Sequence, residues 1–98
     1  MEKSDLLTLL QADLDMLTPG SIRENQLSQL IDAAISFINR EGAAVAAPYS
    51  IEDGQLIVMY AAYLFRKRAT DEPMPRMLRW ALNNRIFSEK ARGSENAT

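Results

Sequence analysis

The sequence predicts an all-α protein: a small bundle of about four helices with a central, apolar third helix and a flexible C-terminal tail. Three observations predict this fold. Leucine and isoleucine recur at intervals of three and four residues, the spacing of one helix face. Capping and turn residues separate these segments. Ten apolar residues run without interruption through residues 56–65, and a helix with no polar side has to be covered by the others.

Composition limits the functions open to the chain. Its 98 residues support one domain, and its hydrophobic and charged fractions, 47% and 24%, are ordinary for a globular protein. It has no histidine and no cysteine, which removes imidazole and thiol chemistry, disulfides and nearly every zinc site. It also has no phosphate-binding glycine loop and no nucleophile elbow. We therefore expect no enzyme activity, no catalytic residue, no metal and no cofactor.

No segment of the sequence resembles a membrane or export signal. The apolar run is shorter than the roughly 20 residues that span a bilayer. The first residues lack the basic start and the small-residue cleavage site of a signal peptide. The sequence thus predicts synthesis in the cytoplasm and no contact with a membrane.

The first two helices are expected to be amphipathic. The first begins at Ser4, a candidate N-cap, and TPGS ends it. The second opens with a capping box of Ser21 and Glu24 and ends before Gly42, which suits a left-handed C-terminal position. Their apolar residues are Leu6, Leu10, Leu14 and Leu17 in the first helix and Leu27, Leu30, Ile31, Ala34, Ile35 and Ile38 in the second.

Two further capping signals define the third helix and the segment before it. Residues 43–48 are alanine-rich and are expected to form a mobile or partner-dependent loop, or else a short extended piece. Ser50 with Asp53 forms another capping box and begins the third helix. This helix is expected to end near Arg68 or Ala69, where basic side chains stabilise its negative terminus.

The fourth helix is expected to begin with Pro75 and to run to Phe87. Trp80 and Phe87 lie on a different side of it from the expected core positions. The following SEKARGSENAT has no large apolar side chain and is expected to be flexible. The chain therefore divides into a helical domain, residues 1–87, and a flexible polar tail, residues 88–98. The expected core positions of the fourth helix are Met77, Leu78, Ala81, Leu82 and Ile86.

The third and fourth helices carry more apolar surface than one core contact requires. A central position explains part of this excess for the third helix. The interpretation we favour is that both helices have a second apolar face, which another subunit covers.

Charge is segregated along the chain. Residues 1–65 hold three bases and nine acids, a balance of −6, whereas residues 66–92 hold eight bases and three acids, a balance of +5. Such asymmetry is typical of nucleic-acid binding or of complementary contacts with a partner. The simpler interpretation is two solvated faces.

One long stretch, DGQLIVMYAAYLFRKRATDEPMPRMLRWALNNRIFSEK, resembles the C-terminal half of the head–tail connector proteins of long-tailed bacteriophages, also called adaptor or head-completion proteins. The resemblance is carried by an aromatic–Ala–Ala–aromatic–Leu motif at residues 60–64 and by Arg-Lys-Arg at 66–68. It continues with Met-Pro-Arg-Met-Leu at 74–78 and Asn-Asn-Arg-Ile-Phe at 83–87. The N-terminal half fits through its leucine-rich first helix and LIDAAISFINREG.

The resemblance implies a connector domain that assembles as a ring, commonly twelvefold, beneath the portal of the filled head. Such a ring extends the DNA channel, through which DNA passes without sequence-specific binding. The implied partners are further copies of the chain, the portal protein and the next neck or tail-completion protein. The implied location is the neck of the virion, after synthesis in the host cytoplasm. Residues 88–98 would dock on the portal, and the loop at 43–49 would be remodelled on assembly.

Candidate residues for a partner interface lie at the end of the third helix, along the fourth helix and in the tail. They are Arg66, Lys67, Arg68, Arg76, Arg79, Trp80, Asn83, Asn84, Phe87, Lys90 and Arg92.

The alternative function is a small helical DNA-binding or regulatory protein that uses the Arg/Asn face of the last helix. Arginine reads guanine and asparagine reads adenine in the major groove. A sequence pI near 5.0 and a turn without the glycine of a helix-turn-helix argue against it. Another kind of interaction module is a further alternative. The residues of the DNA-binding alternative are Arg76, Arg79, Asn83, Asn84 and Arg85.

Overall fold

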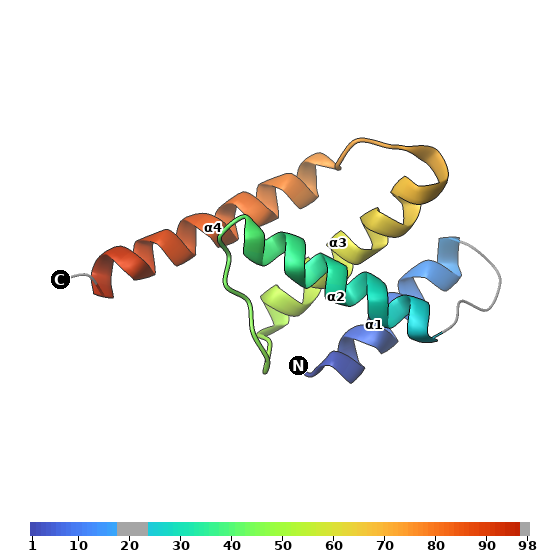
Figure 1. Ribbon diagram of the computed structural model, residues 1–98, viewed down its shortest axis with the longest axis horizontal. Coiled ribbons are helices and arrows are strands. Elements are labelled where there is room, and N and C mark those ends of the chain that lie inside the picture. Colours follow the sequence, from blue (N-terminus) through green and yellow to red (C-terminus); the bar gives the residue numbers. More distant parts are fainter. Residues whose placement is uncertain (18–23, 97–98) are drawn as a thin grey trace.

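The computed structural model describes residues 1–17 and 24–96, without the side chains of residues 15–17, 69–70 and 92–96. The predicted all-α fold is confirmed, because the described residues form four helices and no strand (Figure 1). The helices are α1 (Lys3–Leu17), α2 (Glu24–Arg40), α3 (Ile51–Thr70) and α4 (Arg76–Asn96).

Helix α3 is the centre of the bundle, as its apolar sequence predicts. It packs against α1, α2 and α4, and α4 projects beyond the other three helices toward the C-terminus (Figure 1). All four helices contribute large, fully buried side chains to one core: Leu6, Leu10, Leu14, Ile31, Ile38, Ile57, Leu78 and Leu82. The second helix buries the face that the sequence predicts, with Ile35 only partly covered.

Helix α1 begins one residue before the predicted cap. The backbone N–H of Glu2 donates to the Asp5 carboxylate at 2.9 Å. The side chain that accepts from a backbone N–H at the start of the helix is thus that of Asp5 rather than Ser4. The Ser4 carbonyl instead accepts a hydrogen bond from the Thr8 hydroxyl at 3.1 Å. The predicted Ser21 cap of α2 and the side chain of Leu17 lie outside the described residues.

The end of α2 has the predicted glycine in a left-handed conformation. Gly42 has φ of +113°, and its N–H donates to the Asn39 carbonyl at 3.0 Å. The N–H of Ala43 donates to the Ile38 carbonyl at 3.4 Å, which completes a Schellman motif. Ala43 and Ile38 are both fully buried, so the motif also joins the loop to the core.

The loop after α2 is held more firmly than its alanine-rich sequence indicates. The Asn39 side chain donates to the Val45 carbonyl at 3.0 Å and accepts from the Val45 N–H at 2.6 Å. At the other end, the Tyr49 N–H donates to the Met1 carbonyl at 2.7 Å, and the Met1 amino group donates back to the Tyr49 carbonyl. These partners lie outside the loop's own sequence, in α2 and at the first residue of the chain, so the alanine-rich segment by itself does not indicate them.

The predicted cap of α3 is confirmed, since the Asp53 N–H donates to the Ser50 hydroxyl at 3.0 Å. The helix ends at Thr70, slightly later than predicted, where Asp71 adopts a left-handed conformation and donates to the Lys67 carbonyl at 2.9 Å. A Cβ on Gly54 would lie 2.5 Å from the sulfur of Met1, so glycine permits the close approach of the chain's start.

Helix α4 differs from the prediction in three ways. Pro75 precedes the helix, and its carbonyl accepts the Arg79 N–H at 3.0 Å. Met77 is 76% exposed instead of buried, because the covered face is centred on Leu78 and Leu82. The helix also continues past Phe87 to Asn96, where a polar composition without proline still permits helical backbone.

Candidate interaction surfaces

Helix α4 has an exposed apolar side opposite its buried one. Met77, Trp80 and Phe87 are 76%, 70% and 74% exposed, whereas Leu78 and Leu82 are 1% and 0% exposed. With exposed Asn84 between them, the three exposed residues follow intervals of three, four and three, which place them on one side of a helix. The predicted separation of Trp80 and Phe87 from the core face is therefore confirmed.

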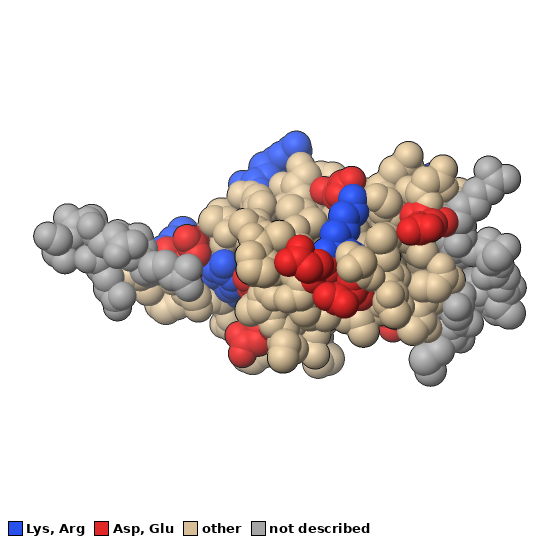
Figure 2. Space-filling model, turned by 90° about the horizontal axis from the view of Figure 1, so that it is seen from below, with Lys and Arg blue, Asp and Glu red and all other residues tan. Residues whose placement is uncertain are grey.

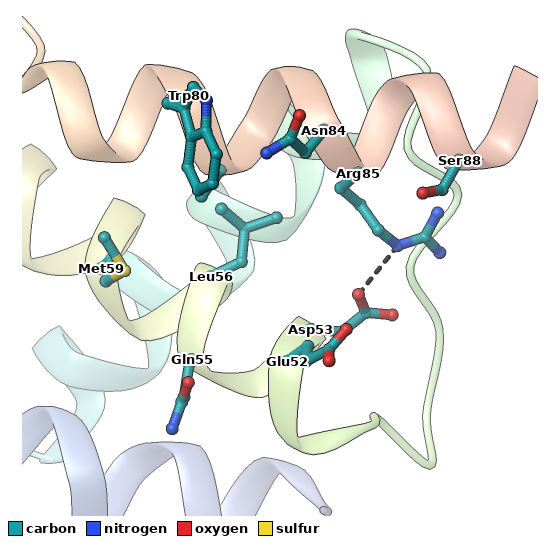
Figure 3. Close-up of a pocket in the computed structure, with 10 residues that line it drawn as sticks. Glu52, Asp53, Gln55, Leu56, Met59, Trp80, Asn84, Arg85 and Ser88 are labelled. Atoms are coloured by element: carbon teal, nitrogen blue, oxygen red, sulfur yellow. Dashed lines mark hydrogen bonds and ion pairs between the residues drawn. The ribbon is translucent and has the colours of Figure 1, made fainter.

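A groove runs between α3 and α4 beside this exposed side. One hollow of about 310 Å³ is lined by Leu56 and Met59 of α3 and by Trp80 of α4 (Figure 3). A second hollow of about 260 Å³ is lined by Met59, by Met77 of α4 and by Asp13 of α1. Met59 lines both hollows, which together are called the Trp80 groove below. Its walls thus come from three helices.

One end of the Trp80 groove is closed by an ion-pair network. The Arg85 guanidinium lies 2.8 Å from the Asp53 carboxylate (Figure 3). It also lies 3.0 Å from the carboxylate of Glu89. Burial lowers the pKa of Arg85, but its hydrogen bonds to both carboxylates outweigh burial and raise it overall. Arg85 therefore fastens α4 to the start of α3. Glu52 and Asp13, which also line the Trp80 groove, form no ion pair among the described residues.

A second groove, between α2 and α3, has an apolar and aromatic floor. The hollow measures about 460 Å³, and Leu30, Phe37 and Leu64 line it. The Phe37 ring stacks on Tyr60 with centroids 6.0 Å apart and remains 40% exposed. Burial, and then the charge of Glu41, raise the pKa of the Tyr60 hydroxyl. This is called the α2–α3 groove below.

The rim of the α2–α3 groove is basic. Lys67 and Arg68 line it, and both side chains are exposed. The Arg40 guanidinium lies 5.6 Å from the centroid of the Phe37 ring. Asp71 is the acid among the lining residues, so the bases around the groove outnumber the acids.

The predicted interface residues are distributed over two surfaces rather than one. Trp80 and Asn84 of α4 and Arg66 of α3 line the Trp80 groove, whereas Lys67 and Arg68 line the α2–α3 groove. Leu64 and Arg68 lie about 140° and 180° around α3 from Met59, so the two grooves open on different sides of that helix. Among the predicted residues, those exposed are Lys67, Arg68, Arg76, Arg79, Trp80, Asn83, Asn84, Phe87 and Lys90; Arg66 is half-buried, and the Arg92 side chain is outside the described part.

Sequence reasoning missed Met59 and Phe37. Met59 stands inside the uninterrupted apolar run, where the pattern marks no side of the helix as exposed. Phe37 directly precedes a core residue of α2, and its position away from the main apolar face was the available signal.

Part of the charge segregation is compensated within the subunit. Arg79 lies 3.0 Å from Glu41 and Arg85 lies 2.8 Å from Asp53, so two bases of the second segment pair with acids of the first. The face seen from below carries acidic side chains with basic ones among them, and no single sign covers it (Figure 2). Arg79 and Arg85, two residues of the DNA-binding alternative, thus engage carboxylates of their own chain. This arrangement disfavours base reading by α4.

In the part of the chain that the structure describes, no helix is both long and apolar enough to cross a membrane. The same residues contain no group of three or more acidic side chains placed to hold a metal ion. No protein-family model, curated protein or solved structure matches the chain. Function is therefore inferred from the residues and their geometry.

Proposed function

We propose that this protein is a head–tail connector subunit of a long-tailed bacteriophage. Copies of it form a ring that joins the portal of the filled head to the tail or to the next neck protein, and the ring extends the DNA channel. The exposed apolar side of α4, with Met77, Trp80 and Phe87, is the observation that supports this proposal most directly. It lies within the stretch whose motifs resemble connector proteins.

An exposed tryptophan in an apolar stripe favours an interface. Contiguous exposed apolar patches mark interaction sites in soluble proteins, and tryptophan is enriched among the residues that dominate binding energy. A ring needs two different complementary surfaces on each subunit, and the chain has two separate grooves on α3. Both features are expected of a subunit whose exposed apolar surfaces are covered by other copies in an assembly.

The electrostatics are compatible with a channel through which DNA moves. Tight binding of phosphates would retard passage, and each phosphate contact adds affinity. Arg79 and Arg85 are neutralised by carboxylates, and the net charge of the chain is −2. The subunit therefore lacks the strongly basic balance of a DNA-binding domain.

Electron microscopy of purified portal rings mixed with the protein tests the proposal. The full chain should add a ring to the portal, whereas Trp80→Ala should reduce the fraction of decorated portals. Thr8→Ala is the control, because Thr8 is exposed on α1 and lines neither groove. Absence of any ring with portals of the cognate phage would refute the proposal. Equal decoration by both variants would instead remove Trp80 from the interface.

A further inference from the structure

The two grooves of the subunit are alike in apolar character and opposite in charge. The Trp80 groove presents Met59, Met77 and Trp80. Its bases are Arg85, which pairs with Asp53, and half-buried Arg66, whereas its exposed acids Asp13 and Glu52 form no ion pair among the described residues. The α2–α3 groove presents an aromatic and leucine floor below a basic rim. Each groove therefore has the charge that would attract the other.

We propose that the Trp80 groove of one copy packs against the α2–α3 groove of the next copy, in a head-to-tail contact. The exposed ridge of Met77 and Trp80 enters the neighbour's groove and covers its Phe37. The acids of the first copy face Lys67 and Arg68 of the second. This inference rests on the proposed function, since it names the surfaces that join neighbouring subunits of the ring.

Charge decides between this contact and a two-fold symmetric one. A symmetric contact through the Trp80 groove would bring Asp13 and Glu52 of one copy toward the same acids of the other. A symmetric contact through the α2–α3 groove would likewise oppose two basic rims. Like charges placed across an interface disfavour association, whereas opposite charges steer partners and fix their register. The head-to-tail arrangement is the one that pairs the signs.

The placement of the acids also sets the orientation of the ridge. Asp13 comes from α1 and Glu52 from α3, so both lie on the groove side of the ridge formed by α4. Exposed Arg76 is on α4 itself, toward the other flank. The neighbour's Lys67 and Arg68 must then meet the groove side. The contact thus has one favoured direction, as a ring requires.

Charge reversal tests the assignment with the full chain. Asp13→Lys/Glu52→Lys changes only the Trp80 groove, and Lys67→Glu/Arg68→Glu changes only the α2–α3 groove. Each double variant alone should associate much more weakly than the original chain in sedimentation velocity. A mixture of the two should recover association, because every contact again joins opposite charges. Melting curves establish that each variant is folded.

Cross-linking supplies a second measurement that also detects weak association. The chain has no cysteine, so single cysteines can be introduced without background. Met77→Cys mixed with Ala33→Cys, a position in the α2–α3 groove, should give a cross-linked heterodimer with a short bis-maleimide. Thr8→Cys mixed with Ala33→Cys is the control and should give a several-fold lower yield, because Thr8 is exposed on α1 and lines neither groove.

Three results would overturn the inference: no cross-link above the control, association of either charge-reversed variant at the original strength, or preferential Met77→Cys homodimers. Failure of the proposed function has a different signature. If portals never acquire a ring while the specific cross-link persists, the contact stands and the neck function falls. If portals acquire normal rings from either charge-reversed variant alone, the function stands and the surfaces are misassigned.

Discussion

At the scale of single side chains, two apolar residues of α4 have different expected roles, one in the stability of the fold and one in assembly. Leu82 is fully buried and Trp80 is 70% exposed, although they stand two positions apart. We expect Leu82→Ala to lower the free energy of unfolding by about 2–5 kcal/mol, because it leaves a cavity in the core. Trp80→Ala should change it by less than about 0.5 kcal/mol, as is usual at exposed positions. Urea unfolding followed by circular dichroism compares the two variants, and equal losses would contradict this assignment.

The same tryptophan reports its own environment. Trp80 is the single tryptophan of the chain, so fluorescence excited at the long-wavelength edge of tryptophan absorption, where the three tyrosines do not absorb, comes from one site. In the free subunit its emission should be that of an exposed indole, and it should shift to shorter wavelength as copies associate. Dilution series of the protein measure this shift. A buried-type emission in a proven monomer would place Trp80 in the core instead.

Arg85 is the residue that fastens α4 to the rest of the bundle. Its side chain is 17% exposed, and it bonds Asp53 and Glu89. Arg85→Met should cost about 1–3 kcal/mol of stability, because it leaves the largely buried Asp53 carboxylate without its partner. Arg76→Met, at an exposed position of the same helix, should change stability by less than about 0.5 kcal/mol. Thermal melts of both variants test this difference.

At the scale of elements, the loop after α2 depends on one side chain of that helix. Asn39 satisfies both backbone groups of Val45, which is 4% exposed. Asn39→Ala should therefore lower stability by about 1–3 kcal/mol and speed hydrogen exchange at the Val45 amide. Ser36→Ala, at an exposed position of α2, serves as the control. Unchanged exchange at Val45 would show that the loop is held by its apolar contacts alone.

The C-terminal part of α4 is expected to serve docking more than folding. Leu78, Leu82 and Ile86, which pack in or against the core, all precede residue 88, and deletion of 88–98 removes Glu89, one of the two carboxylate partners of Arg85. Deletion should lower the melting temperature only slightly and should abolish docking to the portal. Melting curves beside portal pull-downs measure both effects. A large fall in melting temperature would make the segment part of the fold.

The sequence predicted which segments are helical better than it predicted where the helices end and which residues they contact. The Ser50 cap and the Gly42 terminus follow from local backbone geometry, so a few residues suffice to predict them. The predicted end of α4 at Phe87 was wrong, because the apolar periodicity stops there while the helical backbone continues to Asn96. The hydrogen bond between Asn39 and Val45, and the position of Phe37 in the floor of the α2–α3 groove, depend on how α2 packs against its neighbours. Such tertiary placement has no signature in spacing.

At the scale of the whole molecule, the two grooves predict how self-association responds to salt. Raising ionic strength from about 0.1 M to about 1 M shortens the Debye length from about 10 Å to about 3 Å, so exposed charges attract each other less. Association of the original chain should therefore weaken with salt without vanishing, because the apolar ridge still packs in the neighbour's groove. Asp13→Asn/Glu52→Gln should associate more weakly at low salt and should lose most of the salt dependence. Sedimentation velocity of both proteins across this range measures the two trends. Parallel salt curves for the two proteins would show that these acids do not face the basic rim of a neighbouring copy.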